Sequence, residues 1–172
     1  NVEIFTLAEN AAFVYWVTGE EKFARFATDI FNVWLVGTYY MNPILDPEKS
    51  CGSAGGWEPG GICGYYDYEQ IHDDLVMHAA MAYDFAFDYL IRHPHAHLKE
   101  IGKDTKTIAA EVFKRFINIG LVRGGKSGNW NVNGWNIMLR PMLVLDHNEA
   151  YADGKGKEYY LNLLVNESTP YH

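Results

Sequence analysis

The feature that most constrains the fold of this chain is an apolar repeat with steps of three and four residues, which recurs over almost its whole length. This spacing places apolar side chains along one face of a helix, whereas a half-buried strand alternates with period two. The 172 residues contain no convincing alternation of that second kind. The sequence therefore predicts an all-α fold of five to seven helices that pack as antiparallel hairpins.

The repeat and its interruptions also predict where the helices lie. Thr18 and Glu21 have the spacing of a capping box, so the second helix is expected to begin there. Residues 42–66 are rich in Gly and Pro and are expected to form a long ordered loop. The expected helices span residues 2–17, 18–39, 68–92 and 105–121, a segment from about 131 or 133 past Pro141, and residues 157–165.

Length and charge limit the class of protein. A chain of 172 residues is expected to form one domain around one core. The formal net charge of -8 and the lack of a Lys/Arg cluster argue against nucleic-acid binding. No apolar run approaches the roughly 20 residues of a membrane span. The start at Asn1 has neither an initiator Met nor a basic signal region, so we expect a piece of a longer protein.

Two cysteines bracket the glycine-rich part of the expected loop. Cys51 and Cys63 are twelve positions apart, and a disulfide between them would add about 2 to 3 kcal/mol by closing the loop. Two buried free thiols are the alternative. The chain has no CxxC or HExxH pattern, so it predicts neither a metal site nor a cofactor.

Residues 120–127 match the phosphate-binding pattern GxxxxGKS/T. That pattern binds nucleotides only between a strand and a helix, whose N-terminal amides hold the phosphates. Here a helical repeat precedes it. We therefore interpret the segment as a Gly-rich turn between two helices.

The segment 128–136 has the composition of a binding site. It holds four asparagines and two tryptophans in nine residues, without any charge. Asparagine offers a donor and an acceptor that do not titrate, and tryptophan offers a wide apolar face. Asn129, Asn131, Trp130 and Trp135 would therefore suit a polyhydroxylated ligand such as a sugar. An Asn-rich helix cap with two core tryptophans is the alternative.

Histidines mark further candidate positions. His72 lies one turn from Tyr68 and, together with Tyr65 and Tyr66, could supply proton transfer or a hydrogen bond in a cleft. The acidic residues around His72 also fit a helix N-terminus, whose dipole favours negative charge. His78 is expected to be a satisfied core histidine. Three more are expected on a solvated turn: His93, His95 and His97.

Three short segments resemble the heparinase II/III-like polysaccharide lyases. Residues 15–24, with the sequence YWVTGEEKFA, resemble a repeat in the helical toroid of that family. Residues 79–85 resemble its LAYDxL helix, and residues 129–133 resemble the segment at the mouth of its toroid. The resemblance spans most of the chain and implies an (α/α) toroid fragment within a longer, multidomain lyase.

The resemblance also implies a function. Family members cleave uronic-acid-containing polysaccharides by β-elimination, in which donors neutralise the carboxylate before a Tyr or His base removes the neighbouring proton. By position, Asn129 would bind the carboxylate. Trp130 stands where many members have His, which puts that histidine's role in doubt here. The family's catalytic Tyr and β-sandwich domain would follow His172.

The implied protein acts on an anionic polysaccharide or oligosaccharide and is secreted or periplasmic. A uronyl epimerase and a non-catalytic glycan-binding helical domain are the alternatives. We expect the candidate residues to converge on one end of the toroid, because the long loop and the Gly-rich turn each precede an odd-numbered helix of an antiparallel array. The expected cleft combines catalytic Asn129 and His72 with substrate-binding Trp57, Tyr65, Tyr66, Trp130, Asn131 and Trp135.

Overall fold

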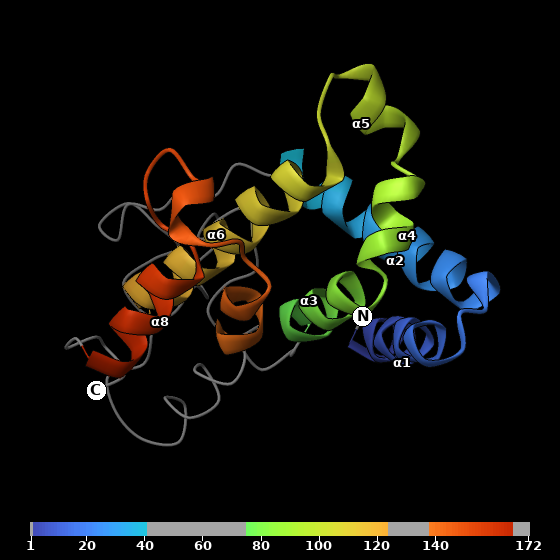
Figure 1. The fold of residues 1–172 in the computed structure, drawn as a ribbon, viewed down its shortest axis with the longest axis horizontal. Coiled ribbons are helices and arrows are strands. Elements are labelled where there is room, and N and C mark those ends of the chain that lie inside the picture. Colours follow the sequence, from blue (N-terminus) through green and yellow to red (C-terminus); the bar gives the residue numbers. More distant parts are fainter. Residues whose placement is uncertain (1, 41–74, 124–137, 167–172) are drawn as a thin grey trace, which may run out of the picture. The chain divides into compact units, whose positions relative to one another are not determined.

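The computed structural model describes residues 2–40, 75–123 and 138–166, and these residues form helices and turns without any strand. The all-α prediction is confirmed. The helices are α1 (Val2–Thr18), α2 (Glu21–Tyr40), α3 (Leu75–Phe85), α4 (Phe87–Arg92), α5 (Ala96–Glu100), α6 (Thr105–Arg123), the 3-10 helix η2 (Asn148–Ala150) and α8 (Lys157–Asn166) (Figure 1). Residues 138–143 are helical as well.

The chain divides into two compact units. The first consists of Asn1–Tyr40 and His78–Val112, and the second of Met41–Met77 and Phe113–His172. The boundaries between the units fall within α3 and α6. Each unit is described below by itself.

In the first unit, α1 and α2 form an antiparallel hairpin. Gly19 follows α1 with φ of 72°, a left-handed conformation that glycine adopts without a Cβ clash. The Gly19 amide donates to the Tyr15 carbonyl at 2.7 Å. Phe5 near the start of α1 contacts Trp34 near the end of α2, with ring centroids 5.7 Å apart. The two helices therefore run in opposite directions.

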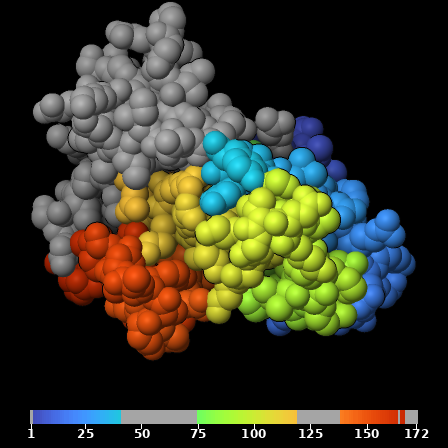
Figure 2. All heavy atoms as spheres, turned by 90° about the horizontal axis from the view of Figure 1, so that it is seen from above, coloured from blue at the N-terminus to red at the C-terminus, as the bar shows by residue number. Residues whose placement is uncertain are grey.

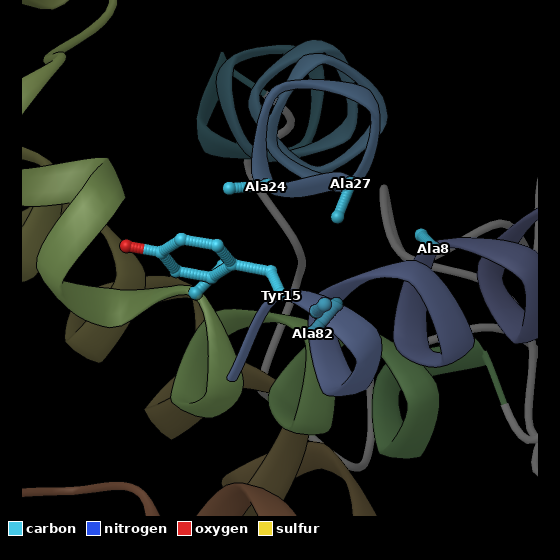
Figure 3. Packing of buried hydrophobic residues seen from close by; sticks show 7 residues of the cluster. Ala8, Tyr15, Ala24, Ala27 and Ala82 are labelled. Carbon is cyan, nitrogen blue, oxygen red and sulfur yellow. The ribbon is translucent and has the colours of Figure 1, made fainter. Parts of the chain in front are cut away.

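Small side chains allow the helices of the first unit to approach each other closely. Figure 3 shows Ala24 and Ala27 of α2 facing Tyr15 of α1 and Ala82 of α3. Each of these alanines is at most 1% exposed. Because a methyl group fills little space, the helix backbones themselves come near contact, and the interior is close-packed. We call this set the alanine cluster: Ala8, Ala12, Tyr15, Ala24, Ala27, Ala82 and Ala86.

The segment formed by α3 and α4 runs alongside α1 in the same direction. Three contacts join positions that advance together along both segments: His78 with Glu9, Phe85 with Phe13, and Asp88 with Tyr15. On the other side, Phe31 of α2 packs against Tyr83, with ring centroids 5.6 Å apart. The first unit is thus built from α1, α2 and α3–α4 around the alanine cluster.

The predicted capping box between α1 and α2 is wrong. Thr18 is the last residue of α1, where its hydroxyl donates to the Val14 carbonyl at 2.7 Å and accepts from the Glu20 amide at 3.2 Å. Helix α2 begins at Glu21, whose carboxylate binds Arg92 at 3.0 Å. Gly19 ends the first helix after Thr18, so Thr18 does not cap the second.

The predicted apolar faces of α1 and α2 are only partly correct. In α1, Ile4 and Leu7 are 53% and 55% exposed, whereas Phe5 is buried. The reason is that α1 is apolar nearly all round, so its spacing does not single out one face. In α2, Phe26 is 48% exposed and Asn32 is buried, because the face that meets α1 is centred on the alanines.

The expected helix over residues 68–92 is divided in the described part of the chain. Ala86 separates α3 from α4 with φ of -106° and ψ of 16°. The backbone hydrogen bonds from Ala86 to Ala82 and from Leu90 to Ala86 persist, so the predicted stripe through Ala82, Ala86 and Leu90 stays buried. No Pro or Gly lies at the break, and the sequence therefore gave no signal for it.

The second unit contains the end of α6, the helix at residues 138–143, η2 and α8. Helix α6 extends to Arg123, so the phosphate-loop pattern begins inside a helix, in agreement with its interpretation as a turn that follows one. The helix at 138–143 includes Pro141, as predicted. Helix α8 also agrees with its predicted range.

A close backbone approach fixes the turn before α8. A Cβ atom on Gly156 would lie 2.5 Å from the Asp146 carbonyl oxygen, so a side chain at this position would force the backbone apart. The Asn148 side-chain oxygen accepts from the amides of Gly156 and Tyr159 at 2.8 and 3.0 Å. The start of α8 is thereby tied to η2.

The start of α6 provides a test of stability. Asp104 accepts from the Thr107 hydroxyl and amide, both at 2.7 Å, and these bonds lower the pKa of Asp104. We expect Asp104→Ala to reduce the free energy of unfolding by about 1 kcal/mol at neutral pH. Because the folded-state pKa is lowered, this contribution is present above the unfolded pKa of about 4 and disappears as pH falls through the folded pKa.

Urea denaturation over a series of decreasing pH values measures this effect. Exposed Asp84 is the matched control, and its replacement by Ala should change stability by less than about 0.5 kcal/mol. A loss for Asp104→Ala that stays constant into acid would contradict the capping role of the ionised carboxylate.

The alanine cluster provides a second test. Ala27 is fully buried between α2 and its neighbours, so Ala27→Leu should destabilise the fold by about 1 to 3 kcal/mol through overpacking. Ala96 begins α5 and is exposed, and Ala96→Leu should have little effect. Equal stabilities for the two variants in chemical denaturation would show that the helices are not closely packed at Ala27.

Candidate functional site

The residues predicted for the Asn–Trp part of the site lie outside the described residues. They belong to residues 124–137, which connect Arg123 at the end of α6 to the helix at 138–143. This group consists of Asn129, Trp130, Asn131 and Trp135.

The other predicted site residues belong to residues 41–74, which connect α2 to α3 and also lie outside the described part of the chain. They are Trp57, Tyr65, Tyr66 and His72. The convergence of the two groups in one cleft therefore stays a prediction. The same holds for the pairing of Cys51 with Cys63.

Within the described residues, a hydrogen-bonded network joins α1, the start of α2 and α4. The Tyr15 hydroxyl donates to Asp88 Oδ2 at 2.7 Å. Arg92 Nη2 donates to the Tyr15 oxygen at 3.1 Å, and Arg92 Nη1 donates to Glu21 Oε1 at 3.0 Å. We call Tyr15, Glu21, Asp88 and Arg92 the Tyr15 network.

The charges of the Tyr15 network follow from its contacts. Burial, followed by the hydrogen bond to Asp88, raises the pKa of the Tyr15 phenol. Burial also acts to raise the pKa of Asp88, but hydrogen bonds from Tyr15, the Tyr89 backbone and Arg92 outweigh it and lower that pKa. The phenol is therefore neutral and the carboxylate ionised at neutral pH. A phenol of raised pKa is poorly suited to abstract a proton, so Tyr15 acts here as a donor that joins α1 to α4.

His78 lies in the contact between α1 and α3. Its Nδ1 contacts the Glu9 carboxylate, and its Nε2 lies 3.5 Å from Thr6 Oγ1. The His78 and Glu9 side chains are 16% and 21% exposed. The prediction of a satisfied histidine is confirmed. Hydroxyl, imidazole and carboxylate follow the order of a catalytic triad, but the Thr6 hydroxyl donates to the Val2 carbonyl at 3.1 Å within its own helix.

A second phenol–imidazole contact joins α2 to α5. The Tyr40 hydroxyl lies 2.6 Å from His97 Nε2, and Figure 2 shows the end of α2 in cyan against the yellow-green α5 segment. His97 Nδ1 lies 3.5 Å from Glu100. His93 instead stacks on Tyr89, with ring centroids 4.2 Å apart. The predicted solvated turn is therefore corrected to a short helix whose histidine contacts α2.

In the second unit, a largely buried lysine connects α6 to the turn before α8. Lys114 Nζ donates to both carboxylate oxygens of Asp153 at 2.8 Å and lies 4.4 Å from the centre of the Tyr151 ring. The hydrogen bond from Lys114 is the main cause that lowers the pKa of Asp153. These contacts hold the turn in place.

Tyr160 of α8 is fully buried, and its hydroxyl donates to Asn118 of α6 at 3.2 Å. Burial raises the pKa of Tyr160 to about 12. Like Tyr15, it is a neutral donor inside the protein. Both phenols with a shifted pKa among the described residues are thus shifted away from the range useful to a general base.

Metal and membrane chemistry receive no support from the described ranges. Residues 2–40, 75–123 and 138–166 contain no group of three His, Cys, Asp or Glu side chains that could hold a metal ion. The helices in the same ranges also fall short of the length and apolarity needed to cross a bilayer.

The sequence gave only a weak signal for the Tyr15 network. Asp88 and Arg92 are four residues apart, a spacing at which opposite charges meet on one helix face. Such pairs are common on helix surfaces. Their connection to Tyr15, which is 73 positions from Asp88, depends on the packing of α1 against α4 and could not be read from spacing alone.

Comparison of the chain with known protein families, with curated proteins and with solved structures finds no match.

The Tyr15 network generates a prediction about stability. Tyr15→Phe should lower the free energy of unfolding by about 1 kcal/mol, because it removes a partly buried hydrogen bond to a charged group. A double-mutant cycle with Asp88→Asn should show coupling of about 0.5 kcal/mol or more. Tyr40→Phe is the control, since its hydrogen bond to His97 is exposed. Additive effects of the Tyr15 and Asp88 changes would contradict the interaction.

Proposed function

We propose that this chain belongs to a polysaccharide lyase that cleaves a uronic-acid-containing glycan by β-elimination and that it supplies part of the active-site cleft. The observation that carries this proposal is the uncharged Asn–Trp segment at 128–136, between α6 and the helix at 138–143. The resemblance of residues 15–24 and 79–85 to the helical toroid of heparinase II/III-like lyases supports it.

The chemistry explains why neutral amides suit this reaction. A base removes the proton from C5 of the uronate, the C–H electrons form the C4=C5 double bond, and the C4–O bond breaks as the leaving oxygen takes a proton. The proton is removable only when the charge that builds on the carboxylate is stabilised by nearby donors. The Asn129 amide is the donor we assign to this carboxylate, and Trp57, Trp130 and Trp135 would stack on sugar rings.

The base belongs elsewhere than in the two buried phenols described above. Tyr15 and Tyr160 both have raised pKa values, so each keeps its proton at the pH at which a base must accept one. In the family that the sequence resembles, the catalytic tyrosine lies in a later helix. His72 remains our candidate within the chain for proton transfer or a hydrogen bond.

The helical packing is compatible with this assignment. An (α/α) toroid is assembled from antiparallel hairpins, and α1 with α2 forms one such hairpin. We propose that the toroid is completed in the full-length protein. A polymeric substrate also places the enzyme outside the cytoplasm, so we propose a secreted or periplasmic protein.

The test is an assay of the full-length protein on heparan, chondroitin, alginate and ulvan, with detection of the unsaturated product by its absorbance. Asn129→Ala should lower kcat by about 100- to 1000-fold, as expected for loss of a donor that stabilises developing charge. Glycan binding should weaken far less. Asn166→Ala is the matched control, because Asn166 is exposed in α8 and bonds only to Asn162 among the contacts established for it.

Other outcomes of this assay lead to different functions. Exchange of the C5 proton without chain cleavage would identify a uronyl epimerase. Binding without either reaction would identify a non-catalytic glycan-binding domain. Full activity of Asn129→Ala would refute the role of this amide whatever the substrate.

A further inference from the structure

An exposed group of aromatic rings lies on the first unit at the side of α1 that faces α3. Phe13 and Trp16 are stacked, with ring centroids 6.1 Å apart and planes inclined by 29°. Phe85 of α3 contacts both rings, at centroid distances of 5.4 and 5.8 Å. We call Phe13, Trp16 and Phe85 the aromatic platform.

The aromatic platform is open to solvent. Trp16 is 65% exposed and Phe13 is 47% exposed. Isolated exposed apolar residues are common, but contiguous apolar surface mostly marks a place where something binds. The rings are held by contacts between two helices of one compact unit, so their arrangement exists before any ligand arrives.

The Tyr15 network borders the aromatic platform. Two consecutive residues of α1 contact two residues that are three positions apart on α3 and α4: Trp16 contacts Phe85, and Tyr15 binds Asp88. Three residues correspond to about 4.5 Å along a helix. The side chains of Asp88 and Arg92 are 64% and 50% exposed. Fixed hydrogen-bonding groups therefore lie within one helical turn of exposed rings.

This combination fits a sugar. We propose that the aromatic platform and the neighbouring Tyr15 network form a binding surface for uncharged pyranose rings of a glycan. The apolar C–H face of a pyranose stacks on aromatic rings, and its hydroxyls donate to carboxylates and accept from a guanidinium. An interface with an apolar protein helix would instead bury the exposed charges of Asp88 and Arg92 beside the rings, which is costly.

Charge determines which sugar is preferred. The Tyr15 network holds two carboxylates, on Glu21 and Asp88, and one guanidinium that binds both of them. The excess negative charge disfavours a uronate at this position. The surface is thus distinct from the Asn–Trp segment assigned to the uronate carboxylate, and it would hold the neutral residues of the same polymer. Only the identity of that polymer rests on the proposed function.

The experiment measures binding of cellohexaose, mannohexaose and xylohexaose to the full chain by calorimetry, with a uronate hexamer as the anionic comparison. We expect at least one neutral oligosaccharide to bind, and Trp16→Ala to weaken it by about tenfold or more, as for an aromatic anchor of a binding site. Trp16→Phe should retain part of the affinity. Leu7→Ala removes a 55% exposed side chain from the same helix and should leave binding unchanged.

Three results would overturn the proposal: no binding of any neutral hexamer at millimolar concentration, equal losses in Trp16→Ala and Leu7→Ala, or self-association of the chain that Trp16→Ala abolishes. Circular dichroism of the variants verifies that each is folded. The outcome is separate from that of the lyase assay. Loss of neutral-sugar binding in Trp16→Ala supports the surface even if no uronate polymer is cleaved, and cleavage that depends on Asn129 supports the lyase even if Trp16 has no role.

Discussion

The close contact between alanines is the interaction on which the first unit depends. Methyl groups on α1, α2 and α3 let three helices meet around Tyr15 with almost no exposed surface between them. Larger side chains are displaced to the edges of this contact, where they form rings of contacts such as Phe5 with Trp34 and Phe31 with Tyr83. Polar pairs lie further out still. The result is a short-range, close-packed centre surrounded by directional contacts that fix the helix orientations.

The sequence predicted the class and most helix ranges because long periodic segments report burial well. The spacing in α6 and α8 agreed with the structure. Errors arose where periodicity was uninformative. Helix α1 is apolar on nearly every side, so its buried face depended on where α2 and α3 lie. Thr18 fits either end of a helix by composition, and the left-handed Gly19 decided between them. Helix α5 has only five residues and one buried apolar side chain, Leu98, too little for a repeat to appear.

The candidate site divides along the same line. Residue types and their density in segment 128–136 point to a ligand without any geometry. The Tyr15 network and the aromatic platform, in contrast, are made by residues about 70 positions apart, and no local pattern announces them. Environment then sets their chemistry: burial keeps the Tyr15 and Tyr160 phenols protonated. Tyrosine abundance, which drew attention to catalysis in the sequence, thus serves packing in at least these two cases.

The two-residue connection through Gly19 has a consequence for the order of folding. Contacts between α1 and α2 close a very short loop, whereas those of α1 with α3 and α4, such as Glu9 with His78, join residues 69 positions apart. The entropy lost on closing a loop grows with its length, and contacts close in sequence form faster. We expect the α1–α2 hairpin to assemble first and to offer its alanines as a preformed surface, onto which α3 and α4 dock in the slower step.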